Sequence, residues 1–368
     1  MFDFASNIFL FNINFLRKIY IFFLLQKKMF LEKIVKNLFY VGLVGLLTFS
    51  YPIPLSSAPI KPKGKIVFGS DCDVKKGKEL YIMDADGKNM RRLTYDKLLI
   101  EHPSFSPDGK EVVYGGATER GDWRYEGGKH WEAYVGALDS FELFILNLET
   151  GKKKQLTHNN VIDYMPDWSP DGKKIAFRRE GKNLIDPVLI YVFDLGSGEE
   201  TKITSEHNAG PPDWSPDGKK IVYSLMTKQA YSYIFPFDKK EVVGWDYDSN
   251  EIYIMDLERN KRKRLTFNSI EDKQPQWSPD GKKIAFVSRR NGNCDIYVMD
   301  ADGSNEKRLT TSPSPDVEPR WSPDGKFIAY NSKGLAGYWE IFITTIDGKW
   351  KKKITNLNAD ATLGDWKY

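Results

Sequence analysis

Hydrophobic and polar residues alternate in short stretches along the chain from about residue 65 to its end. In KKIAFVS, residues 282–288, the bulky apolar side chains of Ile284 and Phe286 recur at every second position, which is typical of a strand with one buried face. A second alternating stretch, DIYVMD at residues 295–300, follows after a short polar segment. Asp-Gly pairs separate such stretches elsewhere, and Gly accepts the positive φ that a tight hairpin turn requires. The pattern therefore predicts an all-β chain of short antiparallel strands.

One ten-residue phrase recurs along this pattern. WSPDGKKIAF occupies residues 168–177 and returns unchanged at residues 277–286, and three variants of it start elsewhere. The opening aromatic residues, here called the anchor aromatics, are separated by 63, 46, 63 and 44 residues; they are Phe105, Trp168, Trp214, Trp277 and Trp321. A degenerate sixth copy, LGDWKY, ends the chain and contains Trp366. Repetition at such a period predicts that each copy is one structural unit.

Each unit reads as four short antiparallel strands in about 45 residues, because a tail such as DIYVMDADGSNEKRLT follows the phrase. Radial arrays of four-stranded sheets are β-propellers. Residues 65–94 hold the second, third and fourth strands of a unit, and residues 361–368 hold a first strand alone. We therefore expect a six-bladed β-propeller that is closed by pairing of the C-terminal strand with the N-terminal blade.

The repeated WSPDGK phrase and the DIYVMDADG stretch resemble the propeller repeats of the TolB family and the related repeats in dipeptidyl-peptidase-like enzymes. The resemblance covers roughly residues 65–368. TolB proteins carry a small α/β domain before the propeller, and we find no such domain before Lys65. The peptidases carry an α/β-hydrolase domain with a Gly-x-Ser-x-Gly elbow, which we do not find either. The resemblance implies a bare TolB-type propeller.

Charge and cysteine content exclude some classes of function. The chain has 54 basic and 50 acidic residues, and the basic residues are spread through the turns. Nucleic-acid binding favours a basic patch, so we expect no nucleic-acid partner. Cys72 and Cys294 fall in units that are not neighbours, and we expect unpaired thiols, with a disulfide as the alternative in an oxidising compartment. No spacing of Cys or His matches a metal motif, so we expect no metal and no cofactor.

The N-terminal region indicates export. From Met29, two lysines precede an apolar run from Leu38 to Phe49, which has the order of a signal peptide and is short for a membrane span. We predict that residues 29–58 are a signal peptide or N-terminal anchor, with cleavage near residue 58, after residue 50, or not at all. Residues 1–28 are then a mis-assigned start or an extra hydrophobic leader. The propeller should be periplasmic or otherwise extracytoplasmic, and should touch a membrane only through an uncleaved segment.

Two units are longer than the others because of insertions between their second and third strands. The insertions are GGATERGDWRYEGGKHWEAYVGALDS at residues 115–140 and LMTKQAYSYIFPFDKKEVVGWDYDS at residues 225–249. Strand alternation places both on the face opposite to the Asp-Gly turns. Their aromatic residues either pack on one another or form a stacking surface for a peptide or glycan. The predicted binding residues there are Trp123, Tyr125, His130, Trp131, Tyr231, Tyr233, Trp245 and Tyr247.

Residues shortly before each anchor aromatic should ring the mouth of the central channel on the same face. The predicted set is Glu101, His102, Asp163, Tyr164, Asp272, Gln274, Asp316 and Glu318. An acidic ring of this kind could capture a cationic group, such as a peptide N-terminus or a Lys side chain. The alternative is a solvated channel rim without a ligand.

No nucleophile–base motif is present, so we assign no catalytic residue. We predict a monomeric, exported, non-catalytic platform that binds a protein or peptide in the cell envelope, with a glycan as a less favoured ligand. The alternative function is a polysaccharide lyase or hydrolase with a His/carboxylate site at the channel mouth. That alternative requires one pocket lined by His102 together with Glu101, Tyr164 and Gln274.

Overall fold

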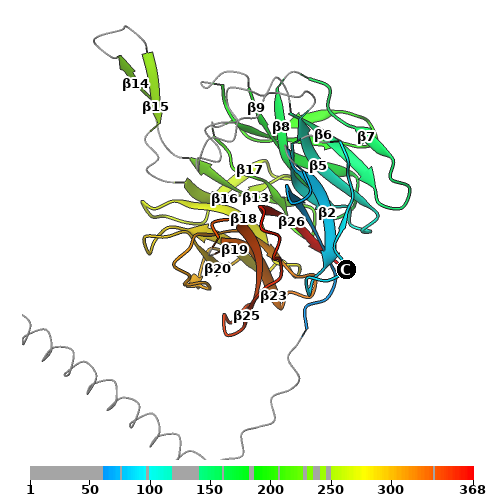
Figure 1. The fold of residues 1–368 in the computed structure, drawn as a ribbon. Coiled ribbons are helices and arrows are strands. Elements are labelled where there is room, and N and C mark those ends of the chain that lie inside the picture. Colours follow the sequence, from blue (N-terminus) through cyan, green and yellow to red (C-terminus); the bar gives the residue numbers. More distant parts are fainter. Residues whose placement is uncertain are drawn as a thin grey trace, which may run out of the picture. The chain divides into compact units, whose positions relative to one another are not determined.

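A computed structural model describes most of the chain after residue 60. The described residues are 61–74, 77–96, 99–117, 141–159, 161–181, 186–205, 208–226, 230–234, 241–245, 250–334 and 336–368. Every regular element among them is a β-strand, which confirms the predicted all-β class for this part of the chain (Figure 1). None of these residues belongs to a helix long and apolar enough to cross a bilayer. The predicted leader and signal segment lie outside the described residues.

The strands pair into antiparallel sheets in which neighbours in sequence are usually neighbours in space. One four-stranded sheet has the order β26 (Ala361–Lys367), β1 (Lys65–Ser70), β2 (Glu79–Asp84) and β3 (Arg91–Arg92). A second has the order β12 (Asp213–Trp214), β13 (Lys220–Met226), β16 (Asn250–Asp256) and β17 (Lys261–Arg264). A third has the order β18 (Asp272–Trp277), β19 (Lys283–Ser288), β20 (Asp295–Asp300) and β21 (Lys307–Arg308). A fourth has the order β22 (Asp316–Trp321), β23 (Phe327–Lys333), β24 (Trp339–Thr345) and β25 (Lys351–Lys353).

Two further units join into one eight-stranded sheet, because Phe141 of β6 makes a single parallel pair with Ile162 of β8. The first unit comprises β4 (Ile100–Phe105), β5 (Glu111–Ala117), β6 (Phe141–Asn147) and β7 (Lys153–Gln155). The second comprises β8 (Ile162–Trp168), β9 (Lys174–Glu180), β10 (Leu189–Asp194) and β11 (Glu200–Lys202). A separate hairpin of β14 (Ala230–Ile234) and β15 (Glu241–Trp245) lies within the second predicted insertion, where the sequence pattern predicts no strand.

The Ser-Pro-Asp-Gly turn is built by the same hydrogen bonds in each copy. In the copy at residues 278–281, the Ser278 hydroxyl donates to an Asp280 carboxylate oxygen at 2.6 Å and accepts the Lys283 amide N–H at 2.9 Å. The Lys282 N–H donates to the same Asp280 oxygen, and Gly281 takes a φ of 68°. The phrase therefore encodes a hairpin turn, and these side chains are committed to the scaffold.

We expect Ser278→Ala to lower the free energy of unfolding by about 1–2 kcal/mol, because it removes two hydrogen bonds from a partly buried turn. Urea unfolding of the variant and the wild type measures the difference. Ser304→Ala is the matched control, since the Ser304 hydroxyl bonds an Asp302 oxygen in an exposed turn, and it should change stability by less than about 0.5 kcal/mol. Equal losses in the two variants would contradict a special role for the repeated turn.

The repeated tail of each unit also has a structural explanation. A buried Thr two residues after the fourth strand accepts the amide N–H of the third strand, as Thr266 does for Ile252 at 2.9 Å. The Thr266 hydroxyl in turn donates to the buried Glu251 carboxylate, which also pairs with Arg264 at 2.9 Å. Corresponding Thr–amide bonds occur in the other units, at Thr94, Thr157, Thr204, Thr310 and Thr355.

The last strand completes the first sheet. β26 pairs with β1 from Lys65↔Lys367 to Ser70↔Ala361. Asn331 fastens the start of β26, because its side-chain oxygen accepts the Leu363 N–H at 2.7 Å. A Cβ on Gly364 would lie 2.4 Å from the Pro103 carbonyl oxygen, so a glycine is required where β26 approaches β4. The two ends of the described chain are thus held in one sheet.

Apolar clusters fill the spaces between successive sheets. The cluster between the fourth and first sheets contains Phe327, Ile341, Phe68 and Trp366. The first strands of the units also contact one another in the order β4, β8, β12, β18, β22 and β26, and β26 contacts β4 in turn.

Cys72 and Cys294 are half-buried and unpaired.

Candidate functional site

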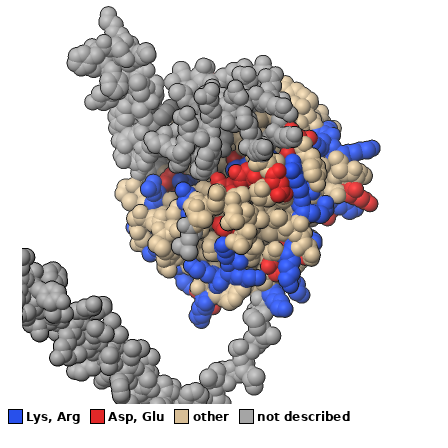
Figure 2. All heavy atoms as spheres, in the orientation of Figure 1, with Lys and Arg blue, Asp and Glu red and all other residues tan. Residues whose placement is uncertain are grey.

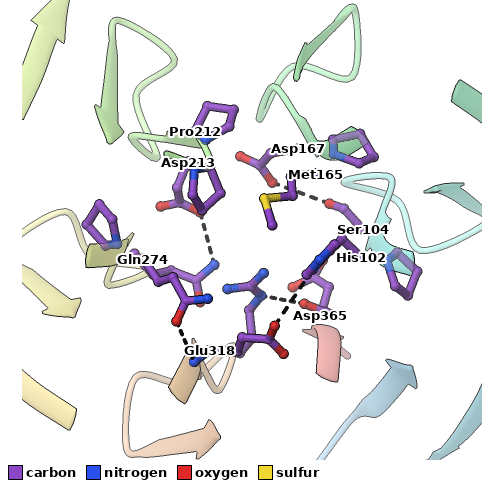
Figure 3. Close-up of a pocket in the computed structure, with 16 residues that line it drawn as sticks. His102, Ser104, Met165, Asp167, Pro212, Asp213, Gln274, Glu318 and Asp365 are labelled. Atoms are coloured by element: carbon purple, nitrogen blue, oxygen red, sulfur yellow. Dashed lines mark hydrogen bonds and ion pairs between the residues drawn. The ribbon is translucent and has the colours of Figure 1, made fainter. Parts of the chain in front are cut away.

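The first strands of the units converge on one small polar cavity (Figure 3). The residue directly before each anchor aromatic lines it; these residues are Ser104, Asp167, Asp213, Gln276, Arg320 and Asp365. The cavity volume is about 30 Å³. That is the space of about one water molecule, and it is far too small for a sugar ring.

Most of these six residues, here called the polar ring, connect one unit to the next. Asp167 accepts the amide N–H of Trp214 at 2.8 Å, and Asp213 accepts that of Trp277 at 2.6 Å. Asp365 accepts the Phe105 N–H at 3.0 Å, and the Gln276 side-chain oxygen accepts that of Trp321 at 3.3 Å. Each acceptor therefore holds the anchor strand of a neighbouring unit, which is a structural task.

The polar ring concentrates negative charge around one guanidinium. Burial raises the pKa of Asp167 well above its usual range, and the nearby charges of Asp213 and Asp365 raise it further. Burial also raises the pKa of Asp213 to about 6, against the hydrogen bonds from Trp277 and Gln276 and the charge of Arg320. Arg320 donates to the backbone carbonyls of Gly364 and Pro319, which hold it in the cavity. The channel therefore contains three acidic side chains, Asp167, Asp213 and Asp365, and one permanent cation, Arg320.

A second layer of side chains is aimed into the cavity by a repeated backbone distortion. His102, Met165, Gln274 and Glu318 all have left-handed φ values of 50–55°, and each precedes a proline. Strand pairing shifts register at these positions, as between Glu101 and Ser104 in β4. Bulges redirect side chains, and a left-handed backbone in residues other than glycine is uncommon and gathers at functional sites. Figure 3 shows His102, Gln274 and Glu318 pointing into the cavity.

His102 lies between two carboxylates. Its Nε2 is 3.4 Å from a Glu101 oxygen, and its Nδ1 is 4.0 Å from a Glu318 oxygen. Burial alone would raise the pKa of Glu101. The positive charge of Lys78, 2.8 Å away, and the neighbouring His102 have the larger effect and hold the Glu101 pKa below its usual range. Burial raises the pKa of Glu318, and His102 opposes this rise. The Gln274 side-chain oxygen accepts the Glu318 N–H at 3.1 Å.

The structure brings together only part of the predicted channel mouth. His102, Gln274 and Glu318 line the cavity, and Glu101 reaches it only through His102. Tyr164 instead donates to Glu180 at 2.9 Å, with Arg178 over its ring. Three predicted acids are fully buried at strand starts and do not line the cavity; they are Asp163, Asp272 and Asp316.

The buried acids at these strand starts have structural partners. Asp163 pairs with Arg179 at 2.6 Å and accepts from Asn159, and Asp272 pairs with Arg290 at 2.6 Å and accepts from Asn268. Burial raises the pKa of Asp316. The contacts of Asp163 and Asp272 give these two acids a structural role at the starts of their strands.

The predicted insertion residues are not placed by the structure. Trp123, Tyr125, His130, Trp131 and Tyr247 lie outside the described residues. Tyr231, Tyr233 and Trp245 lie on the backbone of the β14–β15 hairpin, whose side chains are not described. Among the described residues, no group of three or more His, Cys, Asp and Glu is arranged to hold a metal ion.

Comparison with known proteins agrees with this arrangement. The sequence profile of the TolB β-propeller domain matches residues 134–241 and 235–367, which is more than half of the chain. This chain belongs to the TolB β-propeller family. Its all-β sheets are accordingly those of a TolB-type propeller, and the small cavity lies where the first strands of the propeller units meet.

Individual relatives are distant. The chain is 30% identical over 240 residues to the Tol-Pal system protein TolB of Francisella tularensis subsp. mediasiatica, covering 57% of this chain and 50% of that protein. It is 25% identical over 225 residues to a TolB homolog of Protochlamydia amoebophila, covering 59% and 42%. The chain therefore spans about half the length of these curated relatives. The TolB crystal structure from Acinetobacter baumannii has a TM-score of 0.65 at 21% identity, covering 82% and 66%, which shows a shared fold.

The polar ring of this TolB-type propeller was missed by our interpretation of the sequence. Its members occupy the position directly before each anchor aromatic, as in the pairs DW, DW, QW, RW and DW. A polar residue at that position in every unit was a visible signal of a shared role. Arg320 is the one basic residue among the six members of the polar ring, and it indicates that the acidic members need a balancing positive charge.

Asp213 gives the propeller a specific pH dependence. Its native pKa of about 6 exceeds the unfolded value of about 3.9, so between these values the native state holds a proton that the unfolded state releases. The contribution of Asp213 to stability is therefore present below this window and is lost as the pH rises to 6. We expect Asp213→Asn to remove about 2–3 kcal/mol of pH dependence between pH 4 and pH 7, measured by urea unfolding at both values.

Asp217→Asn is the contrasting control. The hydrogen bond from Ser215 lowers the Asp217 pKa, so its contribution is present at neutral pH and is lost as the pH falls. The difference in the free energy of unfolding between wild type and Asp217→Asn should then change with pH in the opposite direction to the difference for Asp213→Asn. Parallel pH profiles for the two variants would contradict the role assigned to the buried carboxylate.

Proposed function

We propose that this chain is an exported, six-bladed, closed TolB-type propeller that binds a protein or peptide at its insertion-bearing face. Six first strands each contribute one residue to a single cavity, and their contacts run from β4 through β26 and back to β4. This arrangement supports both the blade count and the closure. The pairing of β26 with β1 supports a propeller spanning residues 65–368.

The observation that carries the binding role is the strained, partly charged mouth of the channel. His102, Gln274 and Glu318 lie near the starts of their strands, and the alternation of antiparallel strands supports a position on the face where both insertions begin and end. The cavity below them admits one water-sized molecule, so a ligand would be held across the surface. Of the two carboxylates beside His102, Glu101 is already paired with Lys78, so Glu318 is the carboxylate that would meet a cationic group of the partner.

The insertions enlarge this face. They connect β5 to β6 and β13 to β16, that is, second to third strands in two units. Their aromatic residues are suited to the apolar centre of a protein interface, where Trp and Tyr contribute most of the binding free energy. The proposed face would thus combine a polar mouth with two insertions rich in aromatic residues.

We place the partner in the cell envelope. A relative carries the name Tol-Pal system protein TolB, and residues 29–58 of this chain read as a signal peptide or anchor. On this view translation starts at Met29. A protein or peptide partner fits these observations, and a glycan is the less favoured ligand.

Affinity capture from envelope extract tests the proposed face. The wild-type chain should retain a partner that a Trp123→Ala, Trp131→Ala, Trp245→Ala variant loses, provided that circular dichroism shows both folded. The matched control replaces three exposed apolar residues at the Asp-Gly turn end of their units, Met90, Ile346 and Tyr368, by alanine. Retention by the first variant, or equal loss in the control, would contradict the proposal.

A lyase or hydrolase at the channel mouth is the less supported function. That function needs His102, Glu101, Tyr164 and Gln274 in one pocket, and only His102 and Gln274 line the cavity. Metal analysis and a glycan turnover screen of the wild type and His102→Ala test it directly. Turnover that His102→Ala abolishes would favour this function over partner binding.

A further inference from the structure

A basic patch lies where the described chain begins, at the turn end of the last and first sheets. We define the patch by Lys61, Lys63, Lys88, Lys349 and Lys352, all of which are exposed. The segments that carry it touch one another. The Ala85 N–H donates to the Gly64 carbonyl at 3.0 Å, and Lys352 Nζ donates to the Asp86 carbonyl at 3.2 Å. Figure 2 shows Lys and Arg gathered over this part of the surface, where β25 lies in Figure 1.

The patch is a local excess of charge on a neutral domain. The first 60 residues hold six of the 54 basic and two of the 50 acidic residues, so residues 61–368 contain 48 of each. Segments 61–65, 84–88 and 347–353 nevertheless hold eight lysines against three aspartates. Lys88 and Lys349 approach their nearest aspartates only at 3.5 and 3.6 Å, and their side chains are 78% and 85% exposed. These ammonium groups remain available to an anionic partner.

Protection of sheet edges does not explain the patch. Lysines on outer strands prevent edge-to-edge pairing, and β17 and β25 follow that rule. Lys61, Lys63, Lys88 and Lys349, however, lie in the entering segment and in turns, away from any exposed strand edge. Their concentration therefore calls for a different reason.

The position of the patch along the chain indicates its partner. The apolar run from Leu38 to Phe49 ends 12 residues before Lys61. An extended segment of that length reaches at most about 40 Å. If the run stays in a bilayer, the basic patch is kept near the headgroups, and the local concentration of anionic lipid there is high.

We propose that the basic patch binds anionic lipid headgroups, in addition to the partner-binding role of the opposite face. Strand topology puts the insertions and the channel mouth at the other ends of the strands. Lipid contact at the patch would therefore leave that face directed toward a partner. Each lysine near an anionic surface raises the partition coefficient about fivefold.

Vesicle co-sedimentation of the full chain tests the proposal. Partition is measured on vesicles of neutral phosphatidylcholine and on vesicles with 30% phosphatidylglycerol, a probe composition of about one anionic lipid in three. The ratio of the two partition coefficients isolates the electrostatic contribution, because the N-terminal segment is present in both measurements. We expect a ratio well above one that falls by up to about 600-fold in a variant with Lys61, Lys63, Lys349 and Lys352 changed to Gln, since each lysine contributes about fivefold.

The matched control removes four equally exposed lysines on other outer strands, by changing Lys154, Lys202, Lys261 and Lys307 to Gln. It should leave the ratio nearly unchanged. A wild-type ratio of one, or an equal fall in the control, would overturn the proposal. So would a duplex DNA fragment that binds the wild type as tightly as the anionic vesicles at the same salt concentration, since the patch would then be a general polyanion site. A negative result in this vesicle assay would not bear on the proposed partner face, because the affinity-capture experiment changes different residues.

Discussion

Trp366→Ala is expected to lower the free energy of unfolding by about 4 kcal/mol, because it removes a large buried side chain from the junction of the chain ends. Trp366 is 2% exposed in the cluster between the last and first sheets, where it packs near Phe327. Its indole N–H also donates to the Lys63 carbonyl at 2.8 Å. The substitution therefore opens a cavity where the two ends of the described chain are joined. Urea unfolding at pH 7 measures the loss.

The control for this prediction is Tyr368→Ala, two residues further on. Tyr368 is 71% exposed, so its removal should change stability by less than about 0.5 kcal/mol. If Trp366→Ala also cost less than about 1 kcal/mol, β26 would not belong to the cooperative unit. The pairing of the chain ends would then not stabilise the propeller.

Arg320→Met should lower stability by about 3 kcal/mol at pH 7, because it leaves the buried carboxylates of the channel without their cation. Arg320 opposes the upward pKa shifts of both Asp167 and Asp213. Without it, these acids should bind protons at still higher pH. Since protonation removes the repulsion, the loss should shrink to less than half at pH 4.5. Unfolding curves at the two pH values measure both effects.

The acid rescue separates charge balance from simple packing. A cavity left by a shortened side chain would lower stability equally at both pH values. Arg259→Met is the control, since the Arg259 side chain is 80% exposed beside Asp256 and should have little effect at either pH. A pH-independent loss in Arg320→Met would contradict the proposed role of Arg320.

The repeated phrase made most of the fold predictable. Ser278, Asp280 and Gly281 determine a hairpin by local hydrogen bonds, so their recurrence marked the turns without knowledge of the tertiary structure. The strands of the β14–β15 hairpin were not predicted. The stretches AYSYI and EVVGW are only five residues long each and lie within an insertion outside the repeated phrase.

The site was less predictable, because it depends on which way each side chain points. The positions before the anchor aromatics were expected to ring the channel mouth, yet a bulge at residues such as His102 and Gln274 reverses the alternation expected from sequence. Asp163 and Asp272, at the starts of their strands, therefore turn away into their own units. A left-handed residue before proline is unfavourable on local grounds, and periodicity alone could not indicate it.

Site-specific photo-crosslinking tests the central claim most directly, which is that the face bearing the insertions and the channel mouth contacts a partner. A benzophenone amino acid replaces Trp131 or Trp245 on the insertions, or Lys326, a 58% exposed side chain in an Asp-Gly turn. Irradiation in intact cells should yield one discrete adduct from positions 131 and 245, and none from position 326. Adducts from position 326 alone, or from none of the three positions, would contradict this claim.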